Sequence, residues 1–99
     1  MSTKKKMFAS LPPSYLPELR REAWGRLFGL SIRESRKGAG LTIEQAAPLA
    51  GIEVSEWEAI EHGYVPQDQN LLRAMAAAME ISFDRIAMLV MLCREAWEL

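Results

Sequence analysis

Residues 40–63, GLTIEQAAPLAGIEVSEWEAIEHG, have the pattern of two short helices joined by a tight turn. Thr42 is a favourable N-cap for the first of them, and Gln45 three positions later completes a capping box. Gly51 stands where the turn needs a residue that adopts a left-handed backbone without steric cost. The pattern therefore predicts a helix-turn-helix motif whose second helix covers residues 54–62.

Three more helices are expected around this motif, which makes the chain an all-α, five-helix protein. The first runs from Pro17 to about Lys37, because proline suits the first position of a helix. The fourth follows the N-cap candidate Asp68, and the fifth follows Ser82 and continues to the C-terminus. The organisation expected is an extended basic arm over residues 1–16 and a helix-turn-helix domain over residues 17–99 that ends in a dimerisation helix.

The first helix is expected to bury one apolar face. Its residues are Leu19, Ala23, Leu27, Leu30, Phe28 and Ile32. Gly25 and Gly29 lie inside the same helix, where each glycine costs about 1 kcal/mol relative to alanine. These two glycines indicate a bend or a close contact with another helix.

Many positions also match a known family. They are Ile32, Arg33, Arg36, Gly40, Leu41, Thr42, Ala47, Gly51, Ile52, Ser55, Ile60, Glu61 and Gly63, and downstream Leu72, Ala76, Ala78, Met79, Ile81, Ser82, Phe83, Asp84 and Ile86. Over residues 25–86 the chain resembles the lambda-repressor/Cro-type (XRE-type) helix-turn-helix family. The resemblance implies a five-helix lambda-repressor-like domain that binds double-stranded DNA and regulates transcription, as a repressor does. It also implies an ion pair between Arg36 and Glu61.

The same resemblance implies where DNA would be contacted. The candidate residues are Thr42, Ile43, Val54, Ser55, Glu56, Glu58, Ala59, His62 and Tyr64. Lys4, Lys5 and Lys6 are added because of their charge, which is typical either of a basic arm that follows DNA phosphates or of an ordinary solvated cluster. Ser55 matches a base-contacting position of the family, and its hydroxyl can donate or accept a hydrogen bond. The family often has a glutamine where this chain has Ile43, so backbone N–H groups at Thr42 and Ile43 would meet the phosphate instead.

The distribution of charge leaves two functions open. Residues 1–40 carry nine Lys and Arg against three Asp and Glu, whereas residues 41–99 carry three against ten. The first function is sequence-specific DNA binding, with the attraction supplied by the arm, Arg33 and the rest of the first helix. The second is a helix-turn-helix scaffold that binds a protein, as an antitoxin-like or adaptor dimer. The glutamates of the helix over residues 54–62 favour the second, because DNA phosphates repel them.

The fifth helix is apolar nearly all round. One stripe is formed by Phe83, Ile86, Val90 and Trp97, and another by Met88, Met91, Leu92 and Leu99. A helix of this kind is buried on more than one side, and a small domain covers only one side of it. The sequence therefore predicts a two-fold homodimer, with Met88, Met91, Leu92 and Trp97 at its seam.

No set of residues suited to catalysis or metal binding is present in the sequence. The chain has one histidine, His62, and one cysteine, Cys93, which lies in an apolar run typical of an inert core thiol. It has no glycine-rich phosphate loop and no CxxC or HExxH motif. A non-enzymatic protein without a metal or cofactor is expected. No signal-peptide pattern or membrane-length apolar run occurs either, so the expected location is the cytoplasm.

Overall fold

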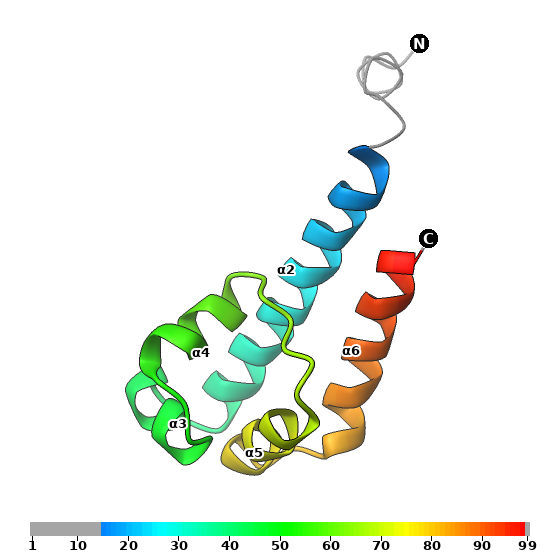
Figure 1. Ribbon diagram of the computed structural model, residues 1–99. Helices are drawn as coiled ribbons and strands as arrows, with labels where there is room; N and C mark the ends of the chain where they lie inside the picture. The colour runs from blue at the N-terminus through cyan, green and yellow to red at the C-terminus, as the bar shows by residue number, and fades with distance from the viewer. Residues whose placement is uncertain (1–14, 99) are drawn as a thin grey trace.

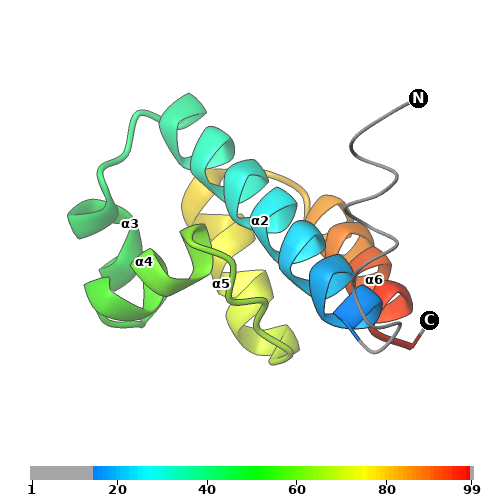
Figure 2. The ribbon, with the colours of Figure 1, turned by 90° about the horizontal axis from the view of Figure 1, so that it is seen from above.

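The computed structural model describes the backbone of residues 15–98 and the side chains of residues 18–94. This part of the chain forms five α-helices and no strand, which confirms the all-α class. The helices are α2 (Tyr15–Gly38), α3 (Ile43–Leu49), α4 (Val54–Glu61), α5 (Gln69–Met79) and α6 (Phe83–Glu98). Figures 1 and 2 show α2 and α6 side by side, with α3, α4 and α5 gathered around the C-terminal half of α2.

The first helix begins earlier than the sequence predicts. It starts at Tyr15, so Pro17 is the third residue of α2 and not the first. Proline is tolerated there because the first-turn N–H groups of a helix have no acceptor within the helix. The predicted arm lysines, Lys4, Lys5 and Lys6, lie outside the described residues.

The buried face of α2 also differs from the predicted one. Phe28 and Ile32 are each 1% exposed, as expected, but Leu19, Leu27 and Leu30 are 40%, 54% and 51% exposed. Ala23 is exposed as well. Apolar residues occur around most of α2, so helical periodicity alone fits more than one face. The contacts with α4 and α6 select the face that carries the two glycines.

Gly25 and Gly29 allow the C-terminal end of α4 to lie directly on the backbone of α2. A Cβ atom added at Gly25 would lie 2.5 Å from the carbonyl oxygen of Gly63. One added at Gly29 would lie 2.5 Å from the carbonyl oxygen of Glu61. Both distances are too short for a real Cβ, which confirms the close helix contact predicted from these glycines. The contact fixes the end of α4 against the middle of α2.

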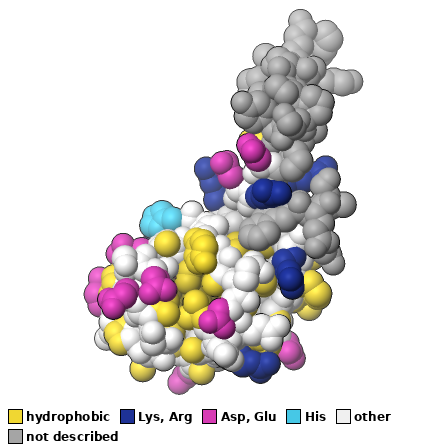
Figure 3. Space-filling model, viewed as in Figure 1, with side chains coloured by type: hydrophobic (Ala, Val, Ile, Leu, Met, Phe, Trp, Pro, Cys, Tyr) yellow, Lys and Arg dark blue, Asp and Glu magenta, His cyan; other side chains and the backbone are white. Residues whose placement is uncertain are grey.

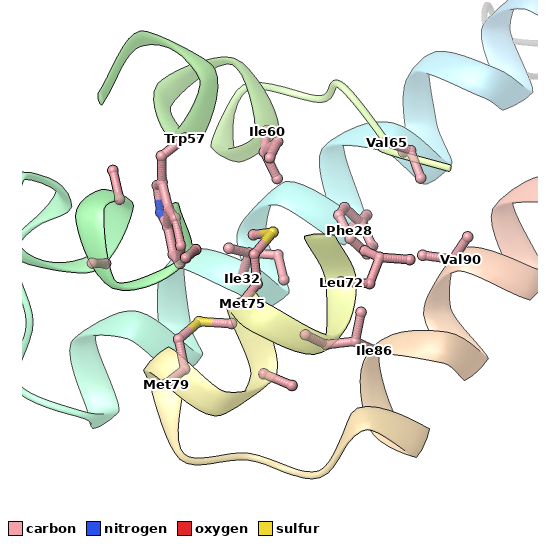
Figure 4. Close-up of a cluster of buried hydrophobic side chains, with 14 of the residues drawn as sticks. Phe28, Ile32, Trp57, Ile60, Val65, Leu72, Met75, Met79, Ile86 and Val90 are labelled. Atoms are coloured by element: carbon pink, nitrogen blue, oxygen red, sulfur yellow. The ribbon is translucent and has the colours of Figure 1, made fainter. Parts of the chain in front are cut away.

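A single core joins all five helices. Its largest fully buried side chains are Trp57, Phe28, Ile32, Ile60, Met75, Met79, Ile86 and Cys93. Figure 4 shows Trp57 and Ile60 of α4 packing toward α2 and α5, while Ile86 and Val90 of α6 close the other side. The Cys93 thiol is buried and donates to the carbonyl oxygen of Trp24 at 3.5 Å. Cys93 is 1% exposed, which confirms the buried cysteine predicted from the sequence, and this burial raises the pKa of the thiol.

The expected caps of the last two helices are present. Asp68 Oδ1 accepts a hydrogen bond from the Asn70 N–H at 2.9 Å, and Ser82 Oγ accepts one from the Arg85 N–H at 3.3 Å. Such side-chain acceptors satisfy N–H groups that the helix itself cannot pair. Among the described residues, no helix has the length and apolarity needed to cross a membrane.

Candidate nucleic-acid interface

The two short helices predicted over residues 42–62 are α3 and α4, and they contact each other. Gln45 N–H donates to Thr42 Oγ1 at 3.2 Å, and Thr42 N–H donates to Gln45 Oε1 at 2.9 Å. The predicted capping box is therefore confirmed. Gly51 has a φ of +74°, as the turn between the helices requires. Helix α4 ends at Glu61, and His62 is its C-cap.

The predicted ion pair between Arg36 and Glu61 is present. Arg36 Nε donates to Glu61 Oε2 at 2.6 Å, and Arg36 Nη2 donates to Glu61 Oε1 at 3.1 Å. The two side chains are 11% and 5% exposed. The hydrogen bond with Glu61 raises the pKa of the Arg36 guanidinium. Arg36 Nη1 also donates to the carbonyl oxygen of Leu41 at 2.8 Å, so one side chain ties α2 to the start of α3 and the end of α4.

Trp57 takes part in the same cluster, a role that sequence reasoning missed. Its indole Nε1 donates to Glu61 Oε2 at 2.6 Å. Trp57 and Glu61 are four residues apart in α4, a spacing at which helical side chains meet. That spacing was the signal available in the sequence. With Trp57 and Ile60 buried, the opposite side of α4 is exposed.

This exposed side of α4 carries four of the predicted DNA contacts. Ser55, Glu56, Glu58 and Ala59 are exposed, and Val54 is half-buried. His62 is exposed, with its Nδ1 2.7 Å from the carbonyl oxygen of Glu58, and Tyr64 is 61% exposed. At the start of α3, Thr42 is exposed and Ile43 is half-buried.

Five of the predicted contact residues line two separate hollows. Glu56, Ala59 and Tyr64 line one of about 360 Å³. Ile43 and His62 line the other, a groove of about 560 Å³ called here the α2 groove. Its lining residues are Arg26, Leu30, Arg33, Arg36, Ile43, Glu61 and His62. The structure thus brings Ile43 and His62 together with Arg33, which was predicted to attract DNA, and with Arg26, which was not singled out.

The surface of α3 and α4 is acidic. Residues 41–66 contain five glutamates and no lysine or arginine. Glu61 is paired with Arg36, and the other four, Glu44, Glu53, Glu56 and Glu58, are exposed. Figure 3 shows acidic side chains gathered over this part of the molecule, with basic side chains along α2 above it.

Part of this acidity has a local structural cause. Glu56 lies in the first turn of α4, where a negative charge interacts favourably with the helix dipole. Its Oε1 lies 3.5 Å from the N–H of the N-cap residue Glu53, at the outer limit of a hydrogen bond. Glu56 therefore stabilises the start of α4 whatever that helix contacts.

The predicted dimer residues are exposed on α6. Met88, Met91 and Leu92 are 61%, 56% and 36% exposed, while other residues of the same helix are buried in the core. The side chain of Trp97 lies outside the described residues. In the described part of the chain, no group of three His, Cys, Asp or Glu side chains converges on a point that could hold a metal ion.

Comparisons of the chain with protein-family models, with curated proteins and with solved structures found no match. What this surface binds must therefore be inferred from its own residues. Two properties matter most. The exposed side of α4 is rigidly held, and its charge is opposite to that of the neighbouring groove on α2.

Proposed function

We propose that the chain binds double-stranded DNA as a homodimer and regulates transcription, with the exposed side of α4 in the major groove. The observation that carries the proposal is the fixed presentation of α4. Arg36 and Trp57 both hold Glu61, and the glycines of α2 leave no side chain between the end of α4 and α2. A helix that reads base edges must be held in a constant orientation, and these contacts provide it.

The residues on the exposed side of α4 suit a close approach to DNA. Ser55 and Ala59 are small and exposed, so they do not hold the helix away from the base edges. The Ser55 hydroxyl can donate to or accept from a base, and an apolar side chain such as Val54 can contact a thymine methyl group. We assign sequence readout to these three residues.

Backbone groups at the start of α3 supply one contact to a phosphate. The Thr42 N–H, which was predicted to meet a phosphate, donates to Gln45 Oε1 instead, so that part of the prediction is wrong. The Thr42 hydroxyl accepts from Gln45 N–H and keeps its own hydrogen free to donate. The N–H groups of Ile43 and Glu44, the first two residues of α3, have no acceptor within the helix. Tyr64 and His62 are exposed beyond the end of α4 and add contacts that position the protein without reading sequence.

A binding assay over a series of salt concentrations tests the proposal. Purified protein is titrated with duplex DNA from the region upstream of its own gene and with random duplex DNA. We expect tighter binding to the upstream duplex, and we expect Ser55→Ala to narrow that difference because a base contact is lost. Ser35→Ala is the matched control, since Ser35 lines a separate hollow with Glu80 and Arg85. Equal and negligible affinity for both duplexes would show that the proposal is wrong.

A second function is supported by a specific observation. Four exposed glutamates on α3 and α4 repel phosphates, and within residues 41–66 no lysine or arginine offsets them. A basic surface on another protein would be attracted by the same charges. The second candidate is therefore a helix-turn-helix scaffold that binds a basic protein partner through α4.

A further inference from the structure

We propose that the α2 groove binds one strand of the DNA backbone, with Arg26 and Arg33 as the phosphate ligands. The inference rests on the proposed function and assigns its electrostatic part to a surface outside the helix-turn-helix motif. It gives the protein a source of attraction for DNA that α4 lacks.

The packing of α2 on α4 creates this groove. Arg26 and Leu30 each follow a glycine that is pressed against the end of α4, and Arg33 follows the buried Ile32. A step of one residue turns a helix by about 100°, so these side chains project along the edge of the contact. Across from them stand Ile43 at the start of α3 and His62 at the end of α4.

The two arginines are available to an external anion. Both are exposed, and within residues 18–94 neither forms an ion pair with a carboxylate. Arg36 differs from them, because Glu61 neutralises it inside the groove. An unpaired guanidinium keeps five N–H donors in a planar fork that matches phosphate oxygens. Arg26 and Arg33 are seven residues apart, about 10 Å along the helix axis, so each can meet a different phosphate.

The position of the groove suits the strand that borders the major groove. His62 lines the α2 groove and also terminates α4, so the groove begins where α4 ends. A duplex that receives α4 brings its sugar-phosphate backbone past the ends of that helix. The attraction of two arginines there offsets the repulsion from the exposed glutamates of α4.

An acidic protein segment is the competing occupant. The walls include Leu30, which is 51% exposed, and the half-buried Ile43, so an apolar side chain could rest between the arginines. An arginine fork binds carboxylate and phosphate oxygens alike. We favour the DNA backbone because the groove begins at the end of α4, where a duplex that receives this helix carries its phosphates. The experiment below separates the two occupants.

The test replaces both arginines and measures how DNA affinity depends on salt. For Arg26→Gln/Arg33→Gln we expect the slope of log affinity against log salt to become shallower by about 1.8, since each lost phosphate contact removes about 0.9. The loss of DNA affinity should be the same for the upstream duplex and for random duplex. Arg26→Lys/Arg33→Lys should retain a slope near that of the original protein, because the slope depends on the number of phosphates neutralised and lysine keeps the positive charge. Arg85→Gln is the matched control, since Arg85 is exposed on α6 away from the groove.

Three results would overturn the proposal, and they are distinguishable. An unchanged slope in Arg26→Gln/Arg33→Gln, with DNA binding intact, would show that the groove does not hold the backbone while the proposed function stands. If the original protein binds no duplex DNA at all, both the proposed function and the groove proposal are wrong. If the original protein binds no DNA but retains an acidic protein partner that Arg26→Gln/Arg33→Gln loses, the groove is a protein-binding site. Thermal unfolding of each variant confirms that the fold is intact.

Discussion

Arg36 and Glu61 are joined at two points across the junction of α2 and α4. Arg36 Nε lies 2.6 Å from Glu61 Oε2, and Arg36 Nη2 lies 3.1 Å from Glu61 Oε1. The carboxylate also accepts from the indole of Trp57, so three N–H donors converge on it in a largely buried site. A buried charge held in this way is costly to separate from its partner.

Removing the carboxylate should therefore be strongly destabilising. In Glu61→Ala the guanidinium of Arg36 remains at an 11% exposed site without its partner, and we expect the free energy of unfolding to fall by about 3 kcal/mol. Urea unfolding followed by circular dichroism measures this. Glu58→Ala removes an exposed glutamate from the same helix, and its effect should stay within about 0.5 kcal/mol. Equal effects of the two variants would contradict the assignment.

Adding one methyl group at Gly29 should also weaken the fold. In Gly29→Ala the new Cβ would lie 2.5 Å from the carbonyl oxygen of Glu61 and 2.8 Å from that of Ile60, so α4 must move away from α2. We expect a loss of about 1–3 kcal/mol in the free energy of unfolding. Gly38→Ala, in the same helix, meets no atom within 4 Å and should stabilise the protein by about 0.5–1 kcal/mol. A lower free energy of unfolding for Gly29→Ala and a higher one for Gly38→Ala would together confirm the close contact at Gly29.

The buried thiol gives the fold a dependence on alkaline pH. Burial raises the pKa of Cys93 above its usual value of 9.0. Above about pH 9 the thiol therefore ionises in the unfolded chain while it stays protonated in the folded one, and the free energy of unfolding falls as pH rises. The stability difference between the original protein and Cys93→Ala should accordingly narrow between pH 8 and pH 10. Rapid alkylation of the folded protein at pH 8.5, as fast as in urea, would contradict a buried thiol.

Glu56 separates the two candidate functions. Glu56→Gln removes a negative charge but keeps an oxygen facing the N–H of Glu53. If α4 faces DNA, this variant should bind random duplex more tightly, because a repulsive charge has gone. Glu80→Gln, at the left-handed C-cap of α5, is an exposed control that should leave DNA affinity unchanged. Unchanged DNA affinity for Glu56→Gln, together with loss of a co-purifying protein, would favour the scaffold function.

The proposed homodimer is tested at Met91. Met91 is 56% exposed on α6, and Met91→Glu would place a charge in the proposed seam. Sedimentation should show a dimer at micromolar concentration for the original protein and a monomer for the variant. Leu49→Glu introduces the same charge at a 63% exposed apolar site on α3 and should leave the mass unchanged. A monomeric original protein would contradict the dimer.

Short-range chemistry explains what the sequence predicts correctly. The caps at Thr42, Asp68 and Ser82 and the turn at Gly51 depend on residues at most three positions apart, and all four are present. The same holds for the exposure of Ser55, Glu56, Glu58 and Ala59, which follows from burying Trp57 on the opposite side of α4.

Features that depend on distant contacts were not predictable in the same way. The predicted buried face of α2 was wrong for three leucines and for Ala23, because a helix with apolar residues on several sides has no unique inner face until its neighbours are placed. The α2 groove depends on the contact of Gly25 and Gly29 with the end of α4, more than thirty residues away in the chain. The glycines indicated a contact but not its partner.

The backbone contact between α2 and the end of α4 has a consequence for how the sequence of such a domain can evolve. Because no side chain stands between the two helices at Gly25 and Gly29, the axis of α4 is set by atoms that substitution elsewhere leaves in place. Positions such as 55, 56, 58 and 59 are exposed and lie outside the core. Their side chains can be exchanged one at a time without reorienting the helix. Under the proposed function, base recognition can therefore change while the scaffold stays constant, and a library of substitutions at these four positions is expected to yield new binding preferences.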